Sequence, residues 1–212
     1  MKIYTYIELD KLNEIQFGNV LPYEFNTEIK KELDEFNREI SYIEFEYTNE
    51  IGEEKIVSVD FRILKPTDIK YLEKNSVNIN HYLYEDKEKI EGDLIFIYFW
   101  ERLKGTNRDS NEAQVDRNTT NSSSMLYRKM TTVIDIIKYI SQLYQIKWFI
   151  FQPSRNDVSD GKYKEHNKRD FLYSAYLLHY GIKNFFCYKP YIIDDGLGGR
   201  NSVLLNFSII KL

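Results

Sequence analysis

The chain has 212 residues, of which 42% are hydrophobic and 16% are aromatic. A chain of this length and composition can bury a sizeable core, which excludes disordered, fibrous and linker-like proteins. Its net charge of -4 argues against a general nucleic-acid-binding protein, because basic residues supply most of the affinity for phosphates. No apolar run fits a signal peptide or a membrane-spanning helix. We therefore expect one cytoplasmic domain over residues 1–212, without a membrane association.

The first half of the chain predicts a helix followed by an antiparallel hairpin. Residues 1–9 alternate weakly and fit a first strand. Residues 27–40 follow a capping residue and carry apolar side chains at helical spacing, which predicts a helix. Over residues 41–64 the period changes to two on either side of the turn Asn49–Gly52, and this pattern predicts a hairpin. Residues 66–91 are highly charged and form an insertion of ambiguous structure.

The next part of the chain predicts two strands that flank a long helix. The run Asp93–Glu101 has the continuous apolar pattern of a central strand with two buried faces. Residues 104–124 are rich in Asn, Ser, Thr and charge, and predict a flexible polar loop. Residues 125–145 have one broad apolar face and follow a serine, which predicts an amphipathic helix. Trp148–Phe151 fits another buried strand.

The C-terminal part predicts one more helix and two short strands. The helix is expected over Asn167–Tyr180, with a glycine after it as a C-cap. Strands are expected at 185–188 and 202–211. Between them, Asp194–Gly199 fits a hairpin turn better than a calcium loop, because further oxygen ligands at alternate positions are missing. The complete order predicts a mixed α+β or α/β fold of three layers, with a mixed central sheet and helices on both faces.

This order of a meander, a long helix, a strand and a second helix resembles the GNAT acetyltransferase superfamily. The matching segments are Asp93–Glu101, Met125–Tyr144, Trp148–Phe151 and Asn167–Tyr180. Around the last segment, Asn167, Leu172-Tyr173 and Gly181-Ile182 resemble a pattern found in many GNAT proteins, with altered spacing. The combination looks most like the small GNAT-like proteins of many phage genomes. The heavy use of Ile, Lys, Asn and Tyr is typical of an AT-rich host.

The resemblance implies an acetyl-coenzyme A site at the start of the long helix. GNAT enzymes hold the pyrophosphate there on the backbone N–H groups of a glycine-containing turn. This chain has NTTNSSSMLYRKM instead, with no glycine between Thr106 and Met125. The serines fit a helix cap as well as an anion site. The residues that the resemblance assigns to the cofactor are Ser122, Ser123, Ser124, Arg128 and Lys129.

The resemblance also implies two catalytic residues. Tyr173 would be the general acid that protonates the departing thiolate, and Glu101 would deprotonate the acceptor amine through a water molecule. Tyr173 equally fits an amphipathic tyrosine at the edge of a core, and the carboxylates of the strands fit solvated faces. No histidine or cysteine cluster has the spacing of metal ligands, so we expect no metal site.

Two functions follow from this interpretation. In the first, a GNAT-like protein of phage or mobile-element origin has lost the coenzyme A motif and binds a protein partner, which is a host factor, a virion component or its own copy. In the second, the chain is an active acetyl-coenzyme A-dependent N-acyltransferase. The missing glycine motif favours the first function. The expected location is then the host cytoplasm, with the virion as the alternative.

Overall fold

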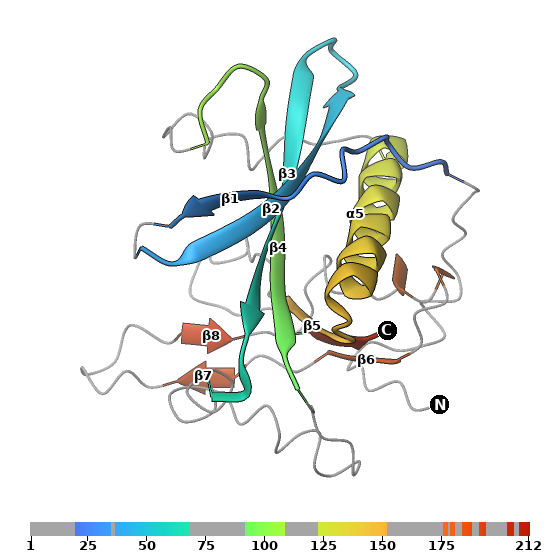
Figure 1. Cartoon of the computed structure of the whole chain (residues 1–212). Helices are drawn as coiled ribbons and strands as arrows, with labels where there is room; N and C mark the ends of the chain where they lie inside the picture. Colours follow the sequence, from blue (N-terminus) through green and yellow to red (C-terminus); the bar gives the residue numbers. More distant parts are fainter. Residues whose placement is uncertain are drawn as a thin grey trace. The chain divides into compact units, whose positions relative to one another are not determined.

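The computed structural model describes two compact units of an α+β protein (Figure 1). The first unit comprises the described residues within 17–62 and 97–144, and the second those within 63–96 and 145–212. The α+β class agrees with the sequence prediction, while the single-domain interpretation stays a prediction. The described residues are 20–34, 37–67, 92–108, 123–151, 176–177, 179–180, 184–187, 191–193, 203–205 and 208–212.

The first unit contains strands in the order β1-β2-β3-β4 and the helix α5. The strand β2 (Glu39–Thr48) pairs antiparallel with β3 (Glu54–Leu64), so the predicted hairpin is confirmed. Gly52, with a φ of 84°, lies in the turn that joins them. The predicted central strand and long helix are also confirmed, as β4 (Leu94–Leu103) and α5 (Ser123–Tyr144).

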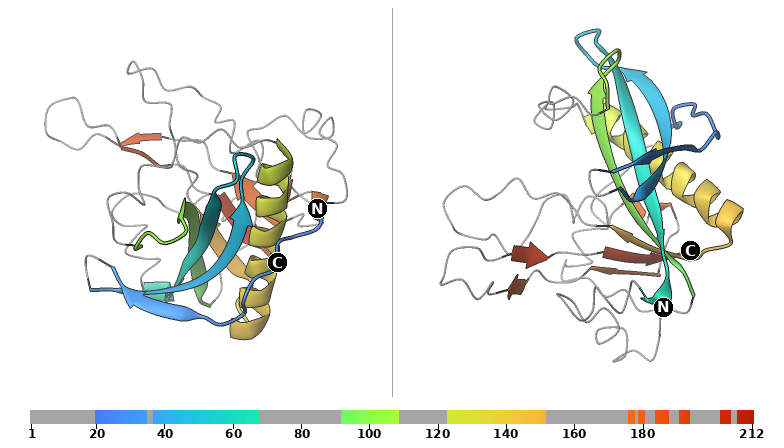
Figure 2. Two further views of the ribbon diagram at one scale, coloured as in Figure 1. Left: turned by 90° about the horizontal axis from the view of Figure 1, so that it is seen from above. Right: turned by 60° about the vertical axis from the view of Figure 1, so that its left-hand side comes forward.

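One face of these strands forms the core of the first unit with α5. Alternation in β2 and β3 turns Ile43, Phe45, Val57, Val59 and Phe61 to this face, where all are buried. The apolar side of α5 is buried as well, and Figure 2 shows the helix running along the strands. The ring of Phe61 meets that of Tyr144 at 5.9 Å between centroids. The helical period of α5 and the period of two in the strands therefore produce matching apolar surfaces.

The second unit contains short strands. Its sheet runs from the first residues of β4 through β5 (Trp148–Phe151) and β9 (Ser208–Lys211) to β6 (Asn184–Cys187). The strand β9 pairs antiparallel with both β5 and β6. The strands β7 (Tyr191–Ile193) and β8 (Val203–Leu205) form a separate antiparallel pair. The predicted strands at 148–151 and 185–188 are thus confirmed, the latter shifted by one residue.

The helix predicted over residues 27–40 is wrong. Lys30–Leu33 instead form β1, which pairs antiparallel with β2. The connecting turn is closed by Asp34, whose carboxylate accepts a hydrogen bond from the backbone N–H of Arg38 at 2.8 Å, and by Asn37 with a φ of 57°. Apolar residues at helical spacing were therefore overridden by a partner strand and by a turn residue that adopts the left-handed conformation.

Other predictions differ in detail or lie outside the described residues. The closing strand predicted at 202–211 is two strands, β8 and β9, which belong to different sheets. Tyr176, Leu177 and His179 are helical, as predicted. The rest of that helix, the first strand at 1–9, most of 66–91 and the turn Asp194–Gly199 lie outside the described residues. Within the part of the chain that is described, no helix combines the length and apolarity needed to cross a membrane.

Candidate functional site

Two of the predicted site residues meet on the helix-facing side of the first unit. Glu101 in β4 forms an ion pair with Lys129 in α5, with 2.9 Å between Glu101 Oε2 and Lys129 Nζ. The hydroxyl of Tyr47 in β2 donates a second hydrogen bond to the same oxygen, also at 2.9 Å. The Lys129 ammonium lies 4.9 Å from the centroid of the Tyr47 ring. The side chains of Lys129 and Glu101 are only 8% and 15% exposed, so water screens this pair weakly.

The elements explain why these groups converge. Tyr47 in β2 and Glu101 in β4 lie on the face of the sheet that carries the buried apolar residues of β2 and β3. Lys129 lies in the second turn of α5, on the side of the helix that also carries the buried Met130. The resemblance assigned Glu101 to catalysis and Lys129 to the cofactor. The structure brings them together as one mostly buried ion pair, and the two assigned roles stay predictions.

Arg128, the other predicted cation, lies on the exposed side of the same turn. Its guanidinium lies 4.0 Å from the centroid of the Tyr23 ring, and Nη2 donates to the carbonyl oxygen of Pro22 at 3.4 Å. The backbone N–H of Tyr23 in turn donates to Thr132 Oγ1 at 2.8 Å. Burial raises the pKa of the Tyr23 phenol, and the charge of Arg128 only partly offsets this effect. Arg128 therefore contacts the segment that crosses α5.

The remaining predicted site residues are placed only in part. The helix α5 begins at Ser123 and Ser124, in agreement with their predicted position at the helix start. Ser122 and Tyr173 lie outside the described residues. The roles assigned to these residues stay predictions.

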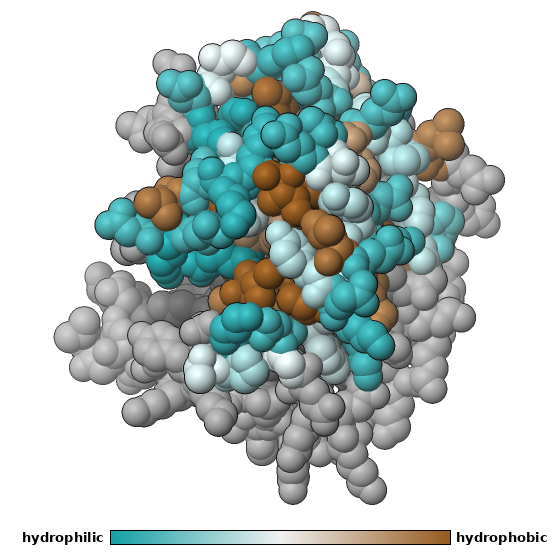
Figure 3. Space-filling view, viewed as in Figure 1, coloured by the Kyte–Doolittle hydropathy of each residue, from teal (hydrophilic) through white to brown (hydrophobic). Residues whose placement is uncertain are grey.

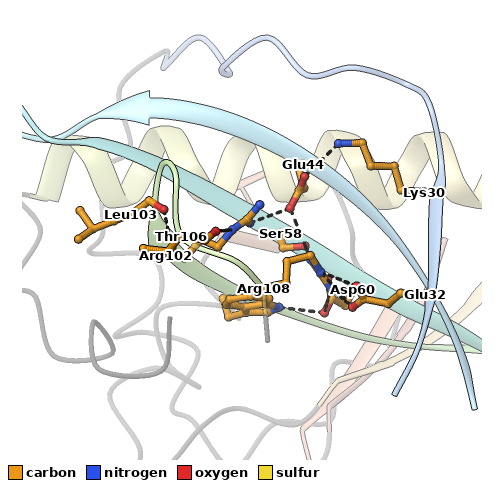
Figure 4. Close-up of polar contacts among 10 residues, drawn as sticks. Lys30, Glu32, Glu44, Ser58, Asp60, Arg102, Leu103, Thr106 and Arg108 are labelled. Atoms are coloured by element: carbon orange, nitrogen blue, oxygen red, sulfur yellow. Dashed lines mark hydrogen bonds and ion pairs between the residues drawn. The ribbon is translucent and has the colours of Figure 1, made fainter. Parts of the chain in front are cut away.

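The opposite face of the same strands carries a second charged cluster, which the sequence analysis missed (Figure 4). Its centre is Asp60 in β3, which is 2% exposed. Asp60 accepts hydrogen bonds from Ser58 Oγ at 2.6 Å and from the indole N–H of Trp100 at 2.8 Å. Beside it, Glu44 in β2 forms an ion pair with Arg102 in β4 at 2.7 Å.

A single arginine from the turn after β4 joins this cluster. The Arg108 guanidinium forms hydrogen bonds with both oxygens of Glu32 in β1, through Nε at 2.9 Å and Nη2 at 2.5 Å. Nη2 also donates to Asp60 Oδ2 at 3.1 Å, and Nη1 donates to Ser58. The planar group lies 3.8 Å from the centroid of the Tyr42 ring. Only 10% of the Arg108 side chain is exposed.

Burial and charge act in opposite directions on these groups. Burial disfavours the charged form of Arg108, but the hydrogen bonds with Glu32 and the charge of Asp60 outweigh it and raise the arginine pKa. Burial alone would raise the pKa of Glu44. The hydrogen bond and the charge of Arg102 outweigh burial, so the Glu44 pKa is lowered. Burial and then the charge of Asp60 raise the pKa of the Tyr98 phenol. For Arg108 and Glu44, the neighbouring opposite charges therefore favour the charged form more than burial disfavours it.

Part of this cluster could have been predicted from alternation. In the segment VSVDF, Val57, Val59 and Phe61 take one face, so Ser58 and Asp60 must take the other. Apolar residues on both faces of β4 are buried, as at Leu94 and Ile95, and Trp100 adds a polar contact through its indole N–H. Arg108 gave no signal, since it lies in the segment that we predicted as a flexible loop and its partners are 48 to 76 positions away.

Comparison of this chain with known proteins finds no match. No protein-family model, curated protein or solved structure matches it. Among the described residues, no group of three or more His, Cys, Asp or Glu side chains is placed to hold a metal ion. The function must therefore be argued from the two charged clusters.

Proposed function

We propose that this chain is a GNAT-like protein of phage or mobile-element origin that does not use coenzyme A and acts by binding a protein partner. The observation that carries the proposal is the buried ion pair between Lys129 and Glu101. A GNAT enzyme would need the two groups for different tasks, one for a phosphate and one for an amine. In this chain each serves the other and helps to hold α5 on the sheet.

A phosphate bound at the start of α5 would have to compete for Lys129. Its ammonium is 2.9 Å from Glu101 Oε2, and the residue is only 6% exposed. Moving it to a phosphate would break the ion pair with the Glu101 carboxylate, which costs free energy at a site that is mostly buried. Glu101 Oε2 already accepts two hydrogen bonds, from the Tyr47 hydroxyl and from the Lys129 ammonium.

The surface indicates how a partner would be recognised. On the face shown in Figure 3, hydrophobic side chains form small separate patches, and hydrophilic ones predominate over β1 and the adjoining end of β2. Large apolar patches mark many permanent interfaces, whereas isolated apolar side chains are ordinary on a protein surface. We therefore infer that charged and polar groups of the first unit recognise the partner.

Isothermal titration of the chain with acetyl-coenzyme A tests the proposal. We expect no saturable heat at millimolar ligand concentration. Saturable binding that Arg128→Glu abolishes, in a variant whose circular dichroism is unchanged, would refute the proposal and favour the N-acyltransferase. Arg38→Glu is a matched control for the charge change, since Arg38 is also an exposed arginine but lies in the turn between β1 and β2. Light scattering over a range of concentrations tests a second copy of the chain as the partner.

A further inference from the structure

We propose that the place occupied by Arg108 is a binding site for an arginine side chain of a partner protein, and that Arg108 fills it in the free chain. The inference rests on the proposed partner-binding function and names the chemistry of that partner. The observation behind it is a guanidinium that is recognised on its edge by carboxylates and on its face by aromatic rings, although it comes from a turn.

The contacts fit a guanidinium specifically. Glu32 receives two N–H groups of Arg108, Nε and Nη2, in the bidentate manner that a planar fork allows. Asp60 and Ser58 receive further N–H groups of the same plane. The face of the group lies against the Tyr42 ring and 5.0 Å from the centroid of the Trp100 ring. An ammonium has no flat face and no fork, so a lysine could not make this set of contacts.

Two of the carboxylates at the site, Asp60 and Glu44, have partners other than Arg108. Asp60 is fixed by Ser58 and by the indole N–H of Trp100. Glu44 is fixed by Arg102 at 2.7 Å and by Lys30 at 3.2 Å. Glu32, Glu44 and Asp60 come from paired strands, so hydrogen bonds of the sheet hold the backbone that carries them. A site that is preorganised in this way can exchange one guanidinium for another with little rearrangement.

The occupant comes from a different kind of element. Arg108 lies after β4 in a short turn, where Gly105 has a φ of 92° and the N–H of Thr106 donates to the carbonyl oxygen of Leu103 at 3.2 Å. A turn can move with smaller loss of contacts than a strand. Without Arg108, Glu32 and Asp60 would both lose the guanidinium with which they form ion pairs. This charge imbalance attracts a cation to the vacated site.

The test uses the full chain with Arg108→Gln, which removes the charge and keeps a similar side-chain length. N-acetyl-arginine amide is titrated calorimetrically into this variant and into the unchanged chain, with N-acetyl-lysine amide as the matched probe. We expect the variant to bind the arginine probe at least about tenfold more tightly than the unchanged chain does, and more tightly than the lysine probe. Adding Tyr42→Leu to the variant should abolish this binding.

The opposite results overturn the inference. If the folded variant binds neither probe, Arg108 is only a structural brace. If it binds both probes equally, the site is an unselective acidic surface. If Arg108→Gln does not fold, its thermal unfolding is followed with each probe, and the inference fails unless the arginine probe alone restores a cooperative transition. Saturable binding of acetyl-coenzyme A by the unchanged chain would refute the proposed function, whereas failure of the arginine titration would leave it standing.

Discussion

The buried ion pair between Lys129 and Glu101 gives the sharpest test of the reasoning, through a double-mutant cycle. Lys129→Met keeps the length of the side chain and removes its charge, and Glu101→Gln keeps an acceptor for the Tyr47 hydroxyl. Each single variant removes one charge of the pair, whereas the double variant removes both. The free energy of unfolding of the four proteins then gives the coupling between the two groups.

The structure sets the size of the expected effect. Two unit charges about 4 Å apart attract by about 4 kcal/mol at an effective dielectric constant of about 20. Desolvation offsets part of this, and removing one partner of a buried pair typically costs about 3–5 kcal/mol. Because the Glu101 side chain is still 15% exposed, we expect Lys129→Met to cost about 3 kcal/mol and the coupling to be about 2 kcal/mol.

Urea unfolding, followed by circular dichroism, measures these values. The ion pair between Lys31 and Glu39 is the matched control, because it has the same 2.9 Å length but side chains that are 58% and 60% exposed. Its coupling should be close to zero, since water screens it. If the buried pair couples no more strongly than this exposed one, then Lys129 does not hold the fold together and is free for another role. That result would remove the main support for the proposed function.

Three further predictions concern the pH dependence of stability, the core and a turn. The pKa of Glu44 is lowered in the folded chain, so the stability that this carboxylate contributes is present above its ordinary pKa of 4.5 and is lost as the pH falls. Glu44→Gln should therefore flatten the acid side of a plot of unfolding free energy against pH. In α5, Ile134→Ala should cost about 2–4 kcal/mol in urea unfolding because Ile134 is fully buried, while Leu143→Ala, at an exposed position of the same helix, should cost less than about 1 kcal/mol. Gly52→Ala should lower the thermal midpoint, with a cost of about 1 kcal/mol, because Gly52 has a φ of 84°; an unchanged midpoint would contradict the turn geometry.

The elements that could be predicted from sequence are those whose pattern is local and matches their burial. The period of two in β2 and β3 placed Ile43 and Val59 on one face, and both are completely buried. The apolar side of α5 was visible because Ile134 and Ile137 recur at helical spacing over many turns. In these segments, intrinsic pattern and tertiary packing require the same conformation, so the sequence alone was sufficient.

The segment before β2 was predicted wrongly because its determinant is not local. Leu33 is one of the apolar residues whose helical spacing predicted the helix, yet it is 64% exposed at the end of β1. The conformation is fixed by backbone pairing with β2 and by the carboxylate of Asp34, which closes the turn. Lys and Glu at 30 to 32 have good helix propensity but also suit an edge strand, where charge protects against pairing with other chains.

The two charged clusters differ in the origin of their groups, and this difference bears on function. On the helix-facing side, Lys129 and Glu101 both belong to long regular elements, and separating them would break an ion pair that is mostly buried. On the other side, strands supply the carboxylates and a turn supplies Arg108. Regular elements resist displacement, whereas turns and loops are the usual carriers of binding residues. We therefore expect a partner's arginine to displace Arg108 at a lower cost than a ligand would need to displace Lys129 from Glu101. This asymmetry explains why we place recognition on the face that the resemblance to acetyltransferases does not use.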